Sequence, residues 1–315
     1  MKQLLDAHVF RMSSILLHIR SNPMSQIQHT AICPDGSPVK LTVHGAMGAV
    51  KAVVQINPAT AVTERMYFPF AQFLAANGFT VITYNYRGVG RNGPHPKDVK
   101  AGFTSWADND VEAVTEWVAE HYPGLAHMAI GHSFGGHAIG LCASSRRLSA
   151  AVTVCSQAGC LRFITPAMER LKVSLLLKVI GPLSAKLLGY VPGRRLGLGE
   201  DIPANVMLEW SRWTSLRNYF FDDPSVNAAA RFSRPSLPIL ALGFNDDPWA
   251  PAQAIDLMMG HLTGCTVERR QLGPEDSDGA SIGHLGFFRH RHADTLWPVV
   301  LTWLKTQLPD NQYDI

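Results

Sequence analysis

One short run, Gly131-His132-Ser133-Phe134-Gly135, constrains the fold more than any other part of the sequence. It matches the G-x-S-x-G pattern of a nucleophile elbow, a sharp turn between a strand and a helix that exposes a serine hydroxyl. The pattern needs glycines because the serine backbone is strained and larger side chains would collide with the neighbouring strand and helix. A short apolar segment, 127–130, precedes the run, and small residues continue from 136 to 143. Strand, turn and helix therefore occur in the required order, and Ser133 is predicted to be a nucleophile.

Strand-like and helix-like segments alternate from about residue 30, which predicts a mostly parallel central sheet with helices on both faces. The expected strands cover 30–33, 39–43, 52–56, 79–86, 127–130, 150–155, 239–244 and 266–272, the first two paired as a hairpin, and the longest expected helices cover 64–77, 106–122 and about 290–308. Between about 158 and 236, short apolar helices alternate with Gly and Pro breaks. We interpret that segment as a helical cap inserted into a single domain, 24–315, which follows a poorly ordered N-terminal extension, 1–23.

Composition and charge exclude several kinds of partner. A formal net charge of +3 is too small to indicate a nucleic acid or an anionic membrane as partner. The most apolar stretch, from Leu171 to Leu188, is interrupted by lysines, a glycine and a proline, so no stable membrane insertion is expected. The five cysteines form no CxxC pair, which is typical of a reducing compartment. We therefore predict a cytoplasmic protein.

A serine at such an elbow requires an acid after a later strand and a histidine after the last strand. The segment 239–244 runs directly into Asn245-Asp246-Asp247-Pro248, and His284 lies in a glycine-flanked loop before the last expected helix. His284 would accept the proton of Ser133 during attack on a carbonyl carbon and return it to the leaving group. The aspartate would hold the other ring nitrogen of His284.

Two adjacent aspartates compete for that role. A pattern that places the acid three residues after a glycine selects Asp246, because Gly243 precedes it. A pattern that places a proline four residues after the acid selects Asp247, followed by Pro251. We favour Asp247 and expect Asp246 to cap the loop or the helix that begins near Pro251.

An oxyanion hole should accompany these three residues. In such elbows one donor is the backbone N–H of the residue after the serine, here Phe134, and the second comes from a loop after an earlier strand. That loop contains Asn57-Pro58-Ala59-Thr60. Proline has no N–H to donate, so Ala59 is the predicted second donor.

These motifs together resemble those of the α/β-hydrolases over nearly all of 24–315. More closely, the chain is similar to a family of predicted bacterial α/β-hydrolases with unassigned substrates. The segments that carry the resemblance are 57–60, Tyr84-Asn85-Tyr86-Arg87-Gly88-Val89-Gly90, 131–136, Pro192-Gly193-Arg194-Arg195-Leu196-Gly197-Leu198-Gly199-Glu200-Asp201, 246–247 and 283–288. The acid loop also resembles that of homoserine acetyltransferases, which supports Asp247. The chain departs from many relatives at Asn92, where they have serine, and at Asn57-Pro58, where they have His-Gly. The resemblance implies the α/β-hydrolase fold with an inserted helical cap.

The thirteen histidines raise the question of a metal site. His290 and His292 flank Arg291 near the start of the last expected helix, where their side chains would point to different sides. No carboxylate stands at ligand spacing, so the pattern predicts a surface helix start and no metal site. His132 and His137 lie in the elbow and on its helix. His132 could touch the substrate, although packing or support of the loop is favoured.

Several cap residues have two interpretations. Arg194 and Arg195 could bind an anionic substrate group, although a solvated loop is favoured, and Arg87 is expected to tether a turn. The aromatic residues of the cap could line an acyl pocket, form the core of the cap, or do both. With three leucines they are expected to exclude water: Leu175, Leu176, Leu177, Trp210, Trp213, Tyr219, Phe220 and Phe221.

The sequence therefore predicts a serine hydrolase that cleaves a carboxylic ester or similar acyl bond through an acyl-enzyme, with no cofactor. Its substrate is expected to be a small molecule that is apolar on the acyl side. An acyltransferase would use the same Ser133, Asp247 and His284 but pass the acyl group to an alcohol or thiol. A non-catalytic binding module of the same fold would not need all three residues.

Overall fold

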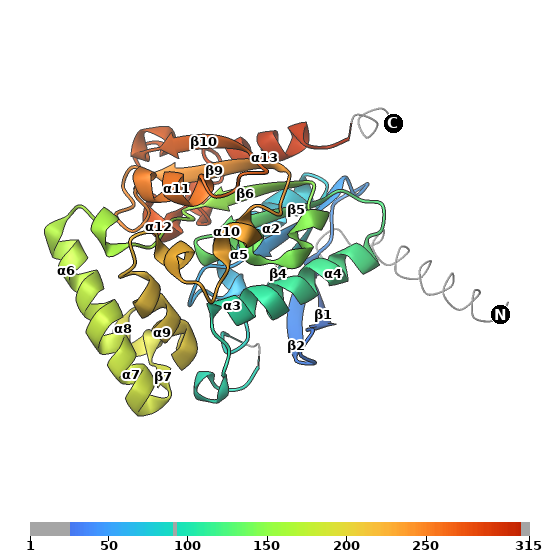
Figure 1. Cartoon of the computed structure of the whole chain (residues 1–315). Helices are drawn as coiled ribbons and strands as arrows, with labels where there is room; N and C mark the ends of the chain where they lie inside the picture. The colour runs from blue at the N-terminus through green and yellow to red at the C-terminus, as the bar shows by residue number, and fades with distance from the viewer. Residues whose placement is uncertain (1–25, 91–92, 310–315) are drawn as a thin grey trace.

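An eight-stranded sheet forms the centre of the protein in a computed structural model that describes residues 26–90 and 93–309 (Figure 1). Its strand order is β1-β2-β4-β3-β5-β6-β9-β10. The strands are β1 (Gln26–Ile32), β2 (Pro38–His44), β3 (Ala52–Asn57), β4 (Phe79–Tyr84), β5 (His127–His132), β6 (Ala150–Val154), β9 (Pro238–Phe244) and β10 (Thr266–Leu272). In the sheet, β4, β3, β5, β6, β9 and β10 run parallel to one another. The two strands at the other edge are antiparallel: β1 pairs with β2, and β2 pairs with β4. The predicted mostly parallel sheet is confirmed. The expected extension, 1–23, lies outside the described residues.

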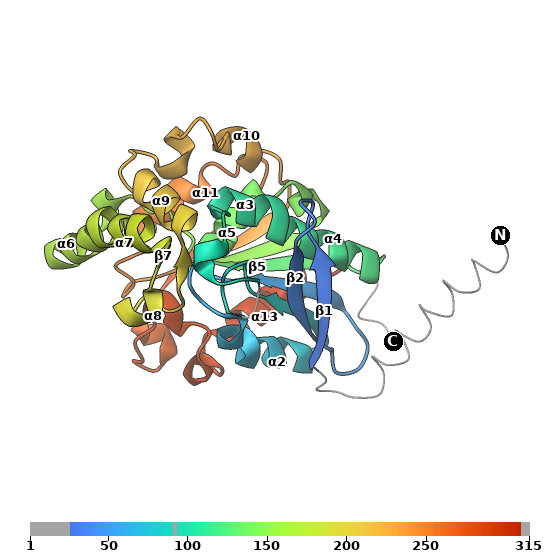
Figure 2. The ribbon, with the colours of Figure 1, turned by 90° about the horizontal axis from the view of Figure 1, so that it is seen from below.

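Helices cover both faces of this sheet (Figure 2). One face carries α2 (Phe68–Ala76) and α13 (Trp297–Thr306), which contact each other through Phe70 and Trp297. The other face carries α4 (Glu112–His121), α5 (Phe134–Leu141) and α11 (Ala252–Met259). The middle strands are buried on both sides, which is why their sequences are continuous apolar runs rather than alternating ones.

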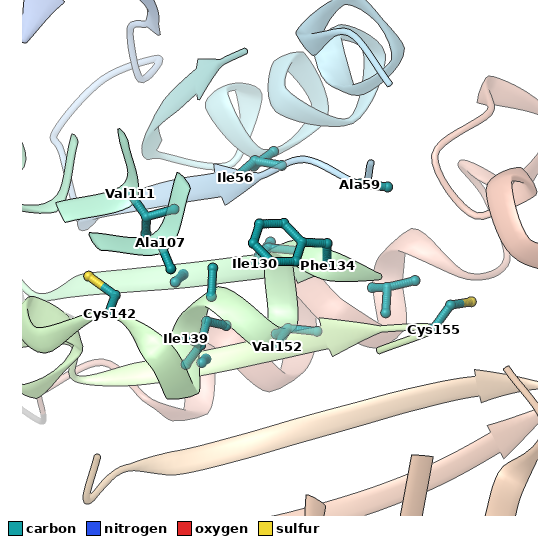
Figure 3. Packing of buried hydrophobic residues seen from close by; sticks show 14 of the residues in the cluster. Ile56, Ala59, Ala107, Val111, Ile130, Phe134, Ile139, Cys142, Val152 and Cys155 are labelled. Carbon is teal, nitrogen blue, oxygen red and sulfur yellow. The ribbon is translucent and has the colours of Figure 1, made fainter. Parts of the chain in front are cut away.

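The packing is closest around α5, the helix that follows the elbow. Ile56 of β3, Ile130 of β5, Val152 of β6 and Ile139 of α5 are at most 1% exposed and pack around it (Figure 3). This apolar layer holds β3 and β5, which lead into the loop of Ala59 and the turn of Ser133, at fixed positions beside β6.

The hairpin of β1 and β2 turns at Gly36, whose φ of 84° is a left-handed conformation that favours glycine. Arg87 ties this hairpin to the rest of the molecule. Its guanidinium pairs with Asp35 in the turn and with the fully buried Asp110. The structure thus confirms Arg87 as a structural tether.

Between β6 and β9 the chain forms a group of helices at one side of the sheet (Figure 1). They are α6 (Ala167–Leu175), a π-helical stretch (Leu176–Ile180), α7 (Gly181–Leu188), α8 (Gly193–Leu196), α9 (Ala204–Trp213) and α10 (Ala228–Phe232), with the short strands β7 (Tyr190–Val191) and β8 (Ile202–Pro203). This segment has the helical character expected of the cap, whose boundaries stay a prediction. None of the helices in the described residues is long and apolar enough to cross a membrane.

Three helix boundaries differ from those expected. The helix expected over 64–77 begins with a 3₁₀ turn, Glu64–Tyr67, and that over 106–122 begins with a π-helical stretch, Trp106–Val111. The last helix begins at Trp297 rather than near 290. Pro298 fits the later start, because a proline is tolerated in the first turn of a helix but not in its interior. His292 lies before this helix and is fully buried, with its Nδ1 2.7 Å from the Ser277 hydroxyl. The prediction of a surface position was therefore wrong for His292.

Candidate active site

Ser133 lies in the sharp turn between β5 and α5, with φ 52° and ψ −115°. Its N–H donates to the Val154 carbonyl oxygen at 2.8 Å, which fixes the turn against β6. The glycines around it are required by close contacts: an added Cβ at Gly131 would lie 2.4 Å from the Gly136 nitrogen, and one at Gly135 would lie 2.1 Å from the Asn57 carbonyl oxygen. These are the collisions that the glycine pattern indicated.

The structure brings Ser133, His284 and Asp247 together from three separate loops. His284 Nε2 lies 3.1 Å from Ser133 Oγ, and His284 Nδ1 lies 2.7 Å from Asp247 Oδ2. Asp247 Oδ1 accepts from the backbone N–H groups of Trp249 and Ala250 at 2.9 and 3.2 Å. Because a carboxylate can only accept, Nδ1 of His284 carries a proton and Nε2 is available as a base toward Ser133.

Asp246 is occupied elsewhere in the same pair of loops. Its Oδ2 accepts from the Ser281 hydroxyl and the Ile282 N–H, both at 2.8 Å, and its Oδ1 accepts from the Gly283 N–H at 2.9 Å. Asp246 therefore fastens the loop that carries His284 without contacting its ring. The sequence patterns pointed to both aspartates, with Asp247 favoured, and the geometry agrees with Asp247 as the partner of His284.

Electrostatics at Asp247 favour its ionised form despite its burial. Burial would raise the pKa of Asp247, but the charge of His284 and hydrogen bonds from His284, Cys155 and the Trp249 N–H outweigh that effect, and the pKa lies below its ordinary value. Cys155, Asp247 and His284 lie close enough to hold a metal ion. However, burial and Asp247 raise the pKa of the Cys155 thiol well above its ordinary value. Without a metal ion, the thiol is therefore expected to be protonated.

The two predicted oxyanion donors come from the elbow and from the loop after β3. Phe134 is the first residue of α5, so its N–H has no acceptor within the helix. The Ala59 N–H donates to the Tyr67 hydroxyl at 2.8 Å. The second donor predicted from the sequence is thus engaged by a side chain, and no sequence motif marked Tyr67 as part of the site.

Tyr67 continues into a chain of hydrogen bonds that ends at the catalytic loop. His132 Nε2 lies 2.8 Å from the His284 carbonyl oxygen, so Nε2 carries the proton. His132 Nδ1 then accepts from the Tyr67 hydroxyl at 2.9 Å. Burial lowers the pKa of His132 to about 3, which keeps the ring neutral. His132, expected to support the elbow, links the loop of Ala59 to that of His284.

A cavity of about 450 Å³ opens above Ser133 and His284. Its walls are mostly apolar; besides Ser133 and His284, the polar residues among them are Thr60, Thr63, Gln157 and Glu200. The larger apolar side chains that line it are Val62, Met66, Leu198, Ile202, Trp210, Trp249 and Leu285. A cavity of this size is within the range of small-molecule sites.

The cap aromatics divide between the two roles left open by the sequence. Trp210 lines the cavity, whereas Trp213 and Phe220 are fully buried and pack with Tyr219 as part of the continuous hydrophobic core. The leucines also divide, since Leu177 is buried but Leu175 is half exposed on the outer surface. Arg194 pairs with Glu200 and is 64% exposed, as expected for a solvated loop.

Residues 41–292 match the family model described as the alpha/beta hydrolase family, and this range contains Ser133, Asp247 and His284. The chain belongs to the α/β-hydrolase family. No curated protein sequence matches the chain.

Solved structures of other α/β-hydrolases share the fold at low sequence identity. A thermostable carboxyl esterase from Bacillus coagulans is 15% identical with a TM-score of 0.60, covering 90% of this chain and 99% of that one. An esterase from Pyrococcus furiosus is 13% identical with a TM-score of 0.59, covering 91% and 92%. The α/β hydrolase GrgF from Penicillium is 17% identical with a TM-score of 0.58, covering 90% and 99%.

Proposed function

We propose that this α/β-hydrolase is a serine esterase that cleaves a carboxylic ester, or a similar acyl bond, through an acyl-enzyme on Ser133. The observation that carries the proposal is the continuous chain of contacts from Ser133 Oγ through His284 to Asp247 at the floor of an apolar cavity. The names of two similar structures, both esterases, support the same reaction class.

In the proposed first step, Ser133 Oγ attacks the ester carbonyl carbon while His284 Nε2 takes the hydroxyl proton. The carbonyl oxygen becomes the oxyanion of a tetrahedral intermediate. When the carbonyl double bond re-forms, the bond to the leaving alcohol breaks and that alcohol takes the proton from His284. A water molecule then repeats the sequence at the acyl-enzyme, losing its proton to His284 and releasing the free acid and Ser133. Asp247 stabilises the imidazolium that exists in between.

The Phe134 N–H and the Ala59 N–H are the proposed donors to the oxyanion. The Ala59 N–H would be shared between the oxyanion and the Tyr67 hydroxyl. That sharing fixes the direction of the Ala59 peptide before substrate arrives, which is the preorganisation that such a site requires.

The cavity supports the prediction of an acyl group that is apolar. Trp210, Trp249, Met66 and Leu198 offer no charge to a bound chain, and they reduce access of bulk water to Ser133. The proposed chemistry uses side chains, backbone N–H groups and water only, so it needs no cofactor. Five cysteines without disulfide bonds suit the proposed cytoplasmic location.

Replacing the nucleophile tests this proposal. Ser133→Ala should reduce ester hydrolysis on the order of 10⁶-fold, because no other group lies where Oγ can attack. It should also abolish labelling by a fluorophosphonate probe while leaving thermal unfolding near that of the wild type. A panel of acyl esters of graded chain length, assayed with the wild type, would define the acyl pocket.

Retained hydrolysis within about tenfold of the wild type in Ser133→Ala would contradict the serine mechanism. The acyltransferase alternative is distinguished in the same assay by adding an alcohol acceptor to the wild type. Free acid should dominate over the exchanged ester. If the exchanged ester dominates, transfer is the reaction instead.

A further inference from the structure

The helical segment 167–188 carries a row of large apolar side chains on its outer surface. This segment, the cap helix, consists of α6, the π-helical stretch and α7 in one continuous run. The outer side chains are spaced by three and then by four residues and are between 50% and 73% exposed. They form the apolar row: Met168, Leu171, Leu175, Val179, Leu183 and Leu187.

The apolar row faces away from the rest of the protein. A second row on the same helix, Val173, Leu177, Gly181 and Ala185, is buried toward the molecule, and α7 packs on α9. Figures 1 and 2 show the cap helix at the edge of the molecule, remote from the sheet. Of the twelve exposed large apolar side chains in the described part of the chain, seven lie on this helix. Such a concentration marks an interaction surface rather than scattered exposure.

The charges of the cap helix indicate an anionic partner. It has four basic residues, Arg170, Lys172, Lys178 and Lys186, against one acidic residue, Glu169. The Lys178 amine is held by the Ser211 carbonyl and the Ser215 hydroxyl, while Arg170, Lys172 and Lys186 are exposed. The whole-chain charge of +3 had argued against an anionic membrane, but this one helix alone has a formal charge of +3. Local charge, not the total, acts at a surface within a Debye length.

A second copy of the chain fits this surface less well. Antiparallel pairing about a two-fold axis at Val179 would place Lys172 of one copy opposite Lys186 of the other, so like charges would meet at both ends. The row is also one side chain wide and about 29 Å long, at 1.5 Å per residue. That is a narrow strip compared with the roughly 800 Å² that each partner buries in a standard interface.

A lipid surface avoids both the charge repulsion and the shortage of contact area. It accepts a single apolar row, and its anionic headgroups bind the flanking lysines. We propose that the cap helix docks on the surface of a membrane rich in anionic lipid, with the apolar row in the interface. This docking is peripheral and agrees with the absence of a spanning helix among the described residues.

The docking surface is joined to the cavity at one end. Glu169, in the first turn of the cap helix, accepts a hydrogen bond from Trp249 Nε1 at 3.1 Å, and Trp249 lines the cavity beside His284. A docked cap helix would therefore hold the cavity wall close to the lipid surface. The docking itself does not rest on the proposed esterase reaction.

Co-sedimentation of the full chain with vesicles tests the docking. The wild type should bind vesicles that contain phosphatidylglycerol at least tenfold more tightly than vesicles of phosphatidylcholine alone, and about 0.5 M NaCl should weaken that binding. The double variant Leu175→Gln, Leu183→Gln should lose about tenfold or more in affinity, because two apolar contacts are removed. Ile32→Gln is the matched control, since Ile32 is 65% exposed on β1 and should leave binding unchanged.

The docking is overturned if the wild type does not bind the phosphatidylglycerol vesicles, or if the double variant binds them as the wild type does. If the wild type is a dimer that does not bind vesicles, and the double variant is a monomer, the apolar row is assigned to contact with a second copy instead. Equal thermal unfolding of the variants and the wild type excludes misfolding as the cause. Ser133→Ala should bind vesicles like the wild type, so failure of the proposed reaction and failure of docking are separable.

Discussion

Asp246 and Asp247 are neighbours in one loop, yet their carboxylates face different partners. Asp247 is almost fully buried and contacts the His284 ring, whereas Asp246 accepts three hydrogen bonds from 281–283. Side-chain direction, rather than position in the chain, therefore separates a group that acts on the histidine from one that holds the histidine loop.

This difference predicts unequal effects of two matched substitutions. Asp247→Asn should lower kcat by roughly 10⁴-fold, because an amide that donates to Nδ1 favours the wrong tautomer of His284. Asp246→Asn should lower kcat by less than about tenfold but destabilise the fold by about 1–3 kcal/mol, because two backbone N–H groups lose a charged acceptor. Steady-state kinetics and urea unfolding of both variants check the prediction. The reverse ranking in kcat would assign the acid role to Asp246.

At the residue scale, the sequence located the site better than it described the contacts. Ser133 and His284 stand in glycine-flanked motifs, so a pattern along the chain could find them. The sequence favoured Asp247 over Asp246 only by comparing two spacing patterns, because counting residues does not give side-chain direction. The contact of Tyr67 with Ala59 and His132 joins segments far apart in sequence, and no local pattern encodes such a contact.

At the scale of elements, the turn between β5 and α5 depends on how close two backbones approach. A Cβ at Gly135 would collide with the backbone carbonyl of Asn57 at the end of β3. That strand leads directly into the loop of Ala59. The glycine thus couples the position of the serine to the position of the predicted oxyanion donor.

Gly135→Ala should therefore destabilise the protein and impair the site together. Overpacking of this kind typically costs about 1–3 kcal/mol, and displacement of β3 should reduce kcat more than it changes KM. Gly260→Ala is the matched control, because Gly260 has a helical φ of −60° and the nearest atom to an added Cβ is 3.3 Å away. Urea unfolding and esterase kinetics of both variants provide the measurement. Wild-type stability and kcat in Gly135→Ala would contradict the contact.

The elements that the sequence predicted well are those with a strong local pattern. Continuous apolar runs gave the parallel strands, and the Pro34-Asp35-Gly36 turn gave the first hairpin. The start of the last helix was placed too early, before Pro298, which stands in the first turn of α13 in the structure. The burial of His292 against Ser277 was missed because it depends on a contact between separate segments. The outward direction of Leu175 was missed as well, since a helix apolar on both sides gives no periodic signal of its exposed face.

At the scale of the whole molecule, the sheet and its elbow helix bury four neutral histidines. Burial lowers the pKa of His44 to about 4 and the pKa values of His127, His132 and His137 to about 3, from an ordinary value of 6.5. Between those values the unfolded chain binds protons that the folded chain does not. Stability from these groups is thus fully present above pH 6.5 and is lost as the pH falls below it.

One buried carboxyl acts in the opposite direction. Burial raises the pKa of Asp110 to about 6 despite its pairing with Arg87, so below that pH the folded state gains a proton more readily than the unfolded state. Each group changes stability by at most about 1.4 kcal/mol per pH unit. Four histidines against one aspartate leave a net loss of stability as the pH falls below 6.5.

The free energy of unfolding should therefore fall steeply from about pH 6.5 to pH 5, measured by urea titration at successive pH values. His127→Leu should reduce the slope by roughly a quarter to a third, because it removes one of four histidines whose effect Asp110 partly offsets. It should cost little at neutral pH, since neither ring nitrogen of His127 has a hydrogen-bond partner among the described residues. A free energy of unfolding that stays constant between about pH 7 and 5, or an unchanged slope in His127→Leu, would show that these histidines titrate normally in the folded protein.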